Sequence, residues 1–536
     1  MPFSCLGGCL PFPNPMKQHL NALLIVLAAL STHTAQSQVV APFEREDWAT
    51  AQSPIDDLVL AALGKDGIEP ANPCSDAIFL RRLYLDVMGT LPEPVAVREF
   101  ATSKDPRKRA LLIDALFETE QFADYWSLKW CDVLRVKAEF PINLWPNAVQ
   151  AYHRWIRESI RHNKPYDEFA RELLTGSGSN FRVPPVNFYR AMQGKEPSTI
   201  ASAAALTFMG VRIDKWPQDR RDALAAFFSR VGYKPTAEWK EEIVHLDPAA
   251  TGPLDAVLPD GRQVRIPEGQ DPRGVFADWL ISPDNPWFAR TAVNRIWAWL
   301  LGRGIIHEPD DIRPDNPPTN PELLAYLEKE LVDADYDLRH IYRLILNSRT
   351  YQQSCIPRSD HAQATAQFAH YPVRRLDAEV LIDALCWLTG STESYSSMIP
   401  EPFTFVPEEH RTIALSDGSI TSQFLEMFGR PTRDTGLASE RSNRPTDAQR
   451  LHLLNSSDIQ KRLEQSPKLR RLMAAARWNR GGIIRGIYLT VLSREPTRGE
   501  LAVADEYFRA GGPKPRKAAV DLQWALINSK EFLYRH

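Results

Sequence analysis

Apolar residues recur at intervals of three or four along most of this chain, which is the spacing of one face of a helix. Between residues 55 and about 230 the pattern is carried by sets such as Trp126, Trp130 and Val133, and strand-like alternation is scarce. Trp126 and Trp130 share one face, and we expect them in the core rather than in a sugar-stacking platform. The pattern predicts a mainly α protein.

The pattern changes at residues 235–270. Two short runs, 242–246 and 263–266, flank Gly, Pro and an Asp260-Gly261 turn, which indicates a small β-hairpin or linker. A chain of 536 residues is too long for one hydrophobic core, so two domains or more are expected. We therefore predict helical blocks at 39–234 and 271–536.

The second block opens with a well-marked helix. Asn285 is placed to cap it, Pro286 suits its first position, and Gly302 and Gly304 end it. Further helices are predicted from about 321, 338 and 376, and residues 391–450 read as a long Pro-rich loop region that is functional or disordered. The predicted buried face of the first helix consists of Ala289, Ala292, Val293, Ile296 and Leu300.

Residues 1–38 read as a signal peptide. Met16 and Lys17 precede an apolar stretch at 20–30 and a polar, small-residue segment at 31–38, and translation from Met16 is the alternative start. The stretch is half the length of about 20 apolar residues that a membrane span needs. We expect an exported protein, periplasmic or extracellular, with no stable membrane insertion after cleavage.

Composition narrows the function classes. The net charge of -3, with no concentrated basic run, argues against nucleic-acid binding. Cys74, Cys131, Cys355 and Cys386 remain after cleavage and are too few for a disulfide scaffold. The chain also lacks a His-Glu-x-x-His, a Gly-x-Ser-x-Gly, a Walker loop and a Gly-x-Gly-x-x-Gly, so no cofactor is predicted.

An acidic loop follows the Asn285 helix. Clustered carboxylates suit a hard cation, but Asp and Asn also shape Pro-rich turns, and an arginine among them would satisfy the charge. A structural ion-pair network is the favoured interpretation, with a metal, a ligand or a catalytic role as the alternatives. The loop contains His307, Glu308, Asp310, Asp311, Arg313, Asp315 and Asn316.

A second charged cluster lies in the long loop region. Its guanidinium groups suit bidentate binding of an anion such as sulfate or carboxylate. The favoured alternative is that Asp434 and Glu440 pair with those arginines and fix the loop to the helical body. The cluster contains Arg430, Arg433, Asp434, Glu440, Arg441 and Arg444.

Four residues fall on the polar side of the Asn285 helix. They suit the lining of a cleft, and an exposed amphipathic face explains them equally well. They are Arg290, Asn294, Arg295 and Trp297.

Several segments resemble a known pair of domains. The first domain of unknown function, numbered 1549, is similar to residues 79–92, Arg154-Trp155-Ile156 and residues 163–174. Its partner, numbered 1553, is similar to Asn294-Arg295-Ile296-Trp297, Asp310-Asp311-Ile312-Arg313, Phe428-Gly429-Arg430-Pro431 and residues 451–456. Such pairs are typical of exported proteins of Planctomycetes and Verrucomicrobia.

The sequence departs from many relatives at two places. A Cys-x-x-Cys-His stretch is replaced by residues 209–216, which hold neither Cys nor His, so a thiolate–imidazole site cannot form there. A Cys-x-Cys-Glu-Arg stretch reads Leu437-Ala438-Ser439-Glu440-Arg441. We also expect no N-terminal cytochrome-c-like domain. These departures weaken an oxidoreductase assignment.

Two functions are carried forward. The resemblance implies an enzyme or accessory factor in extracytoplasmic breakdown of sulfated polysaccharides, using the loops at 310–316 and 430–444 around a cleft. The missing catalytic signatures favour the alternative, a non-catalytic protein that binds an anionic polysaccharide or a secreted partner. Whether the two loops meet in one concave pocket distinguishes a shared site from two separate structural loops.

Overall fold

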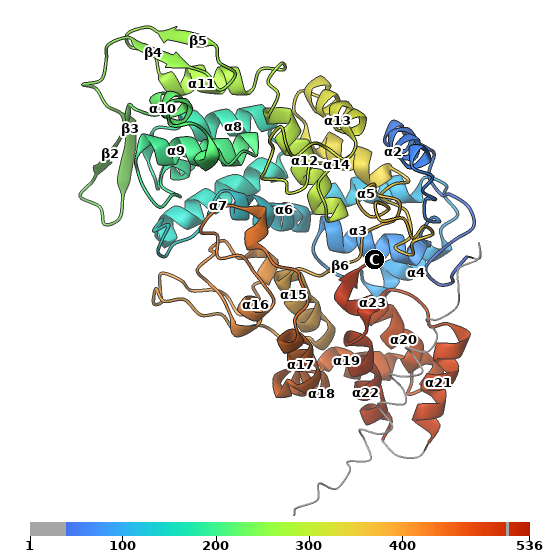
Figure 1. The fold of residues 1–536 in the computed structure, drawn as a ribbon. Coiled ribbons are helices and arrows are strands. Elements are labelled where there is room, and N and C mark those ends of the chain that lie inside the picture. Colours follow the sequence, from blue (N-terminus) through green and yellow to red (C-terminus); the bar gives the residue numbers. More distant parts are fainter. Residues whose placement is uncertain (1–38, 511–513) are drawn as a thin grey trace, which may run out of the picture. The chain divides into compact units, whose positions relative to one another are not determined.

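The computed structural model describes residues 39–510 and 514–536. The predicted signal peptide lies outside this range. Helices dominate the described residues, as predicted, and strands occur only in short antiparallel pairs (Figure 1). No described helix has both the length and the apolarity to cross a bilayer.

The first block is a succession of helices joined by short loops. It includes a π-helical turn, η2 (Ala205–Met209), which continues α9 directly. Its α-helices are α2 (Pro54–Lys65), α3 (Asp76–Val87), α4 (Pro94–Thr102), α5 (Lys108–Phe117), α6 (Glu120–Val133), α7 (Pro146–Arg161), α8 (Tyr166–Thr175), α9 (Pro197–Ala204) and α10 (Gln218–Ala226), with 3₁₀ turns η1 (Pro184–Tyr189) and η3 (Ile213–Lys215).

Two small sheets separate the blocks. The runs predicted at 242–246 and 263–266 are both strands, but they pair with other partners rather than with each other. β3 (Glu242–Leu246) lies between β1 (Gly178–Ser179) and β2 (Val231–Pro235), whereas β5 (Gln263–Ile266) pairs with β4 (Leu254–Val257) across the Asp260-Gly261 turn.

The second block contains the remaining helices. A two-stranded pair joins β6 (Arg374–Arg375) to β7 (Tyr534–Arg535). The α-helices are α11 (Pro272–Leu280), α12 (Phe288–Leu301), α13 (Pro321–Asp333), α14 (Leu338–Asn347), α15 (Ala378–Thr389), α16 (Gln423–Met427), α17 (Asp447–Asn455), α18 (Ser457–Gln465), α19 (Pro467–Ala475), α20 (Arg480–Leu492), α21 (Arg498–Arg509), α22 (Pro515–Ile527) and α23 (Lys530–Leu533), with 3₁₀ turns η4 (Thr412–Ala414) and η5 (Ala438–Glu440).

Helix α12 was predicted as an amphipathic helix and is instead buried on nearly every side. It begins at Phe288, two residues later than expected, and Asn285 Oδ1 accepts from the amides of Trp287 and Phe288 (3.0 and 3.1 Å), which are the contacts of a capping residue. The predicted apolar face is buried, and so are Asn294, Arg295 and Trp297. A helix enclosed on all sides belongs to a core, so the interpretation of an exposed polar face is wrong for these three residues.

The buried apolar side chains form one continuous cluster that extends from Ile55 to Phe532. Trp126 and Trp130 lie inside it, with 1% and 3% of their surfaces exposed, and both contact Trp299 of α12. The prediction that these tryptophans belong to the core is confirmed. Helices of the two predicted blocks therefore share core contacts.

Candidate functional site

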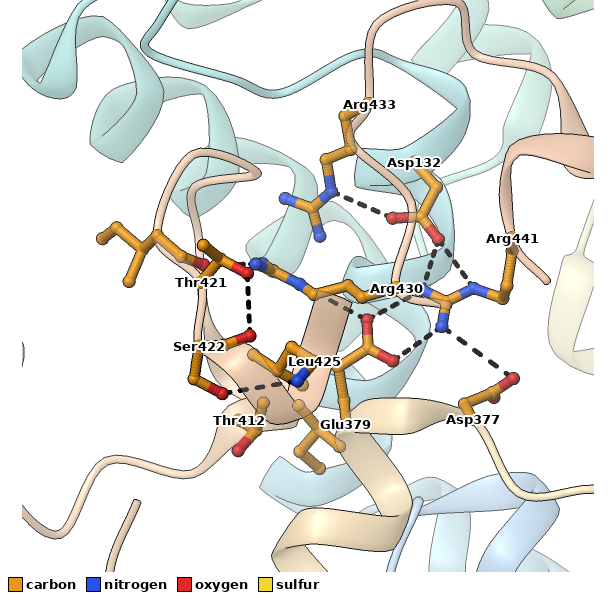
Figure 2. Close-up of polar contacts among 12 residues, drawn as sticks. Asp132, Asp377, Glu379, Thr412, Thr421, Ser422, Leu425, Arg430, Arg433 and Arg441 are labelled. Carbon is orange, nitrogen blue, oxygen red and sulfur yellow. Dashed lines mark hydrogen bonds and ion pairs between the residues drawn. The ribbon is translucent and has the colours of Figure 1, made fainter. Parts of the chain in front are cut away.

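The second charged cluster lies in residues 430–444, which we call the arginine-rich loop. Buried ion pairs fix this loop to helices α6 and α15. Arg441 donates to Asp132 of α6 (2.7 Å) and to Glu379 of α15 (2.6 Å), and Arg433 donates to Asp132 from the other side (2.9 Å; Figure 2). Arg430 lies 3.5 Å from Glu379. The three guanidinium groups and two carboxylates are largely buried.

The charges in this network keep the acids ionised. Burial raises the pKa of Asp132, but Arg441 and Arg433 outweigh it and leave that pKa lowered. At Glu379, burial also raises the pKa, but Arg441 outweighs burial and leaves that pKa lowered. A carboxylate with a lowered pKa is held as an anion and is a poor general acid.

A third buried acid, Asp377, precedes α15. Its Oδ2 accepts from Lys129 (2.8 Å) and Arg535 (3.1 Å), and its Oδ1 accepts from Asn443 (2.7 Å). Burial raises the pKa of Asp377, but Lys129, Arg535 and Arg441 together hold it well below its usual value. Asp377 thus joins α6, the arginine-rich loop and the C-terminal strand.

The acidic loop meets the arginine-rich loop at Asp310. One oxygen of Asp310 accepts from Arg295 of α12 (2.9 Å), and the other accepts from the backbone amide of Ala438 (2.5 Å). Arg295 also donates to the carbonyls of Leu206 and Thr207 in the π-helical turn. Arg295 and Asp310 therefore form a buried pair at the contact between the two loops.

Farther along the acidic loop, the charged and amide side chains from Asp311 to Asn316 have local partners. Arg313 pairs with Asp311 and with Asp315 (3.2 Å each), and Asn316 donates to the carbonyl of Asp311 (2.9 Å). These contacts are those of an ion-pair network. Across the described residues, no group of three or more His, Cys, Asp or Glu is arranged to hold a metal ion.

Two polar residues of α12 are occupied close to the helix. Asn294 exchanges hydrogen bonds with the backbone of Ile306 (2.9 and 3.0 Å). Arg290 pairs with Glu328 of α13 (2.7 Å). Neither of these two side chains joins the Asp310 contact.

The two acids of the arginine-rich loop do not pair with its arginines. Asp434 pairs with Lys137 (2.6 Å), and Glu440 accepts from Thr432 (2.9 Å) and from the amide of Asp434 (2.9 Å). The predicted pairing of these two acids with the loop arginines is wrong. Arg430, Arg433 and Arg441 instead contact acids on helices α6 and α15.

The two loops border one cavity of about 620 Å³. Backbone and side chains from α6, α12 and both loops line it, and its size is that of a small-ligand site. The lining includes the aromatic side chains of Tyr125 and Trp299, the imidazole of His307, and the acids Asp132, Glu308 and Asp377. Its seven cationic side chains are Lys129, Arg295, Arg303, Arg374, Arg441, Arg444 and Arg535.

Two of these cations are unpaired. Five of the seven are bound to Asp86, Asp132, Asp310 or Asp377. Arg303 and Arg444 have neither an ion pair nor a side-chain hydrogen bond with any residue that the structure describes, and Arg303 Nε is buried without a partner. Burial and the charge of Arg303 lower the pKa of nearby His307. The cavity therefore offers uncompensated positive charge.

Residues 209–216 and residues 437–441 each form a hydrogen bond with the acidic loop. Gly210 accepts from the amide of Ile312 (2.9 Å), and Ala438 donates to Asp310. Both stretches lie against the acidic loop. The described cysteines are all free thiols, and none of them lines this cavity.

The sequence pattern did not predict the three acids that hold the site together. Asp132, Asp377 and Glu379 adjoin apolar helical runs, where a charge has no place unless it is paired. That anomaly is the signal that would have singled them out. Their partners are more than sixty residues away in the sequence.

Family comparisons agree with this organisation. A protein of unknown function family, DUF1549 (PSCyt2), matches residues 54–232, and another, DUF1553 (PSD1), matches residues 272–508. No curated protein and no solved structure matches the chain. The matches end and begin on either side of β3, β4 and β5, so the chain belongs to the proteins in which DUF1549 and DUF1553 are paired.

Proposed function

We propose that the protein binds an anionic saccharide, sulfated or carboxylated, in the cavity between the two loops. The observation that carries this proposal is the pair of uncompensated guanidinium groups, Arg303 and Arg444, in one cavity. Guanidinium groups bind sulfate and carboxylate in bidentate fashion. A ligand anion would supply the partner that neither arginine has in the protein.

The rest of the lining suits a sugar. Trp299 and Tyr125 offer aromatic faces, and Ser439, Ser442 and Asn443 offer hydroxyl and amide groups. Sugars present apolar C–H faces and many hydroxyl groups, so a mixed aromatic and polar wall fits them better than a purely apolar one. A volume of about 620 Å³ holds a short saccharide rather than a single ion.

The lining supports binding more than hydrolysis. Glycoside hydrolysis needs two carboxyl groups, one with a raised pKa that acts as the acid. Asp132 and Asp377 are each bound by cations and have lowered pKa values. Glu308 is the remaining acid of the lining. We therefore place the protein as an accessory factor in polysaccharide breakdown, and we propose that it acts after export.

The test is binding of defined oligosaccharides to the purified protein. Isothermal titration with chondroitin sulfate, carrageenan and polygalacturonate oligosaccharides should show saturable binding, and neutral dextran oligosaccharides should show none. The double variant Arg303→Ala/Arg444→Ala should bind at least about tenfold more weakly, since charge-assisted hydrogen bonds are each worth about 1.5–3 kcal/mol.

Arg477→Ala is the matched control, because that exposed arginine lies outside the cavity. It should leave the affinity unchanged. Absence of binding to every anionic oligosaccharide, or equal affinity in the double variant, would overturn the proposal. Product release from any of these oligosaccharides would replace it by an enzymatic function.

A further inference from the structure

A second cavity, separate from the saccharide site, lies among the C-terminal helices. Helices α19, α20 and α22 lie together there with α15 and α4 (Figure 1). Their side chains line a cavity of about 520 Å³. No lining residue is shared with the cavity at Arg303 and Arg444. Much of the wall is apolar, from Leu388, Leu469, Leu472, Ile487 and Val491.

An unsatisfied amide lies in this lining. Gln523 of α22 is 3% exposed, and its side chain forms no hydrogen bond with any residue the structure describes. Buried amides are nearly always hydrogen-bonded, and one without a partner costs folding free energy. Either the site carries that cost for no purpose, or a bound molecule supplies the missing hydrogen bond.

The cavity also carries unpaired positive charge. Lys468 lies over the ring of Trp387, 3.7 Å from its centroid, and burial lowers its pKa. Lys468, Arg98 and Arg471 make no ion pair with any described residue. The one acid of the lining, Glu93, already accepts from Trp387 Nε1 (3.2 Å). The unused polar side chains are therefore mostly hydrogen-bond donors.

We propose that this cavity binds a small amphipathic organic acid. Its apolar body packs against the leucine and isoleucine side chains, and its carboxylate meets the cations around Lys468. The side-chain amide N–H of Gln523, which also has no partner among the described residues, donates to an oxygen of the same carboxylate. An apolar wall alone fits any hydrophobic ligand, but three cations against one engaged acid select a negative head group.

The probe is 4-phenylbutyrate, titrated calorimetrically into the intact protein, with neutral 4-phenylbutanol in parallel. We expect one saturable site for the acid and binding at least tenfold weaker for the alcohol. Lys468→Met keeps the length of the side chain and removes its charge, so it should weaken the acid at least tenfold and leave the alcohol unchanged.

Gln523→Leu separates a ligand role from a structural one. If the amide forms a hydrogen bond with a ligand, this variant should have a higher melting temperature without ligand. Added 4-phenylbutyrate should then raise its melting temperature less than it raises that of the parent. Arg303→Ala/Arg444→Ala should bind 4-phenylbutyrate normally, so failure of the saccharide proposal and failure of this one are distinguishable. No saturable binding of the acid at millimolar concentration, or equal affinity in Lys468→Met, would overturn the proposal.

Discussion

Arg441 is the residue on which the buried charge network depends. It joins Asp132 and Glu379, which come from separate helices. Replacing it with alanine leaves two buried carboxylates short of a partner, a change that typically costs about 3–5 kcal/mol. Arg441→Ala should therefore lower the free energy of unfolding by that amount in a urea titration monitored by circular dichroism.

Arg444→Ala is the control for this variant, because it lies in the same loop, is exposed and has no partner among the described residues. Its stability should stay within about 0.5 kcal/mol of the parent. Equal effects of the two variants would show that the network around Arg441 contributes nothing specific.

The same network predicts how stability depends on pH. Asp132, Asp377 and Glu379 have lowered pKa values, whereas unfolded acids titrate near pH 4. The unfolded chain then binds protons first, so the stabilisation is complete above about pH 4 and is lost as the pH falls through the folded pKa values. The urea midpoint should fall between pH 5 and pH 3.

Asp417 acts in the opposite direction, because burial raises its pKa. Its charged form opposes folding, and protonation relieves this as the pH falls. Asp417→Asn should therefore show a steeper loss of stability on acidification than the parent. A urea midpoint that stays level or rises toward pH 3 would contradict the role of the three paired acids.

At the scale of elements, the turn after α16 requires glycine. Gly429 has φ +81°, and a Cβ there would lie 2.0 Å from the carbonyl oxygen of Ser442. That oxygen also accepts from Arg375, so the loop at Ser442 cannot move away without losing this hydrogen bond. Gly429→Ala should destabilise the protein by more than about 1 kcal/mol, measured by thermal unfolding.

Gly64 gives the opposite expectation. It lies within α2, and a Cβ there would meet nothing within 4 Å. Alanine is better than glycine in a helix by up to about 1 kcal/mol, so Gly64→Ala should raise the melting temperature slightly. A lower melting temperature for Gly64→Ala, or an unchanged one for Gly429→Ala, would show that the backbone around these glycines is not as described.

Much of this element scale could be predicted from the sequence, because helical periodicity is local. The helix predicted from about Pro321 begins there, and the runs at 242–246 and 263–266 are strands. A strand or an ion pair can have a partner that is distant in the sequence, and periodicity does not reveal it. The predicted partners of β3 and of the loop arginines are therefore wrong. Gly178–Ser179 is a strand because β3, more than sixty residues later, supplies its partner.

The site was predicted in part for the same reason. Charged loops are visible as clusters, and both clusters border one cavity. Arg295 looked exposed because its helix also carries polar residues, yet it is buried against Asp310. Lys129 and Asp377 were missed because they pair with each other from positions that are distant in the sequence.

For the whole molecule, residues 41–536 form one compact unit, in which acids of the first block pair with arginines of the second. Asp86 and Asp132 would lose their partners in a fragment that ends at residue 270. We expect residues 39–270 alone to show no cooperative urea transition, whereas the full chain shows one. A fragment with its own sharp transition would establish an independent domain.

The contact between Asp86 and Arg535 also has a consequence for synthesis. Asp86 pairs with Arg374 (2.8 Å) and with Arg535 (2.9 Å), so a charge in α3 is neutralised by residues that come far later in the chain. The ribosome releases α3 long before it makes either arginine. During that interval the nascent chain carries a core carboxylate without its partner, and that part of the core cannot close. That part of the core therefore closes only after these arginines have been made, and until then the unfinished chain depends on whatever keeps it from aggregating.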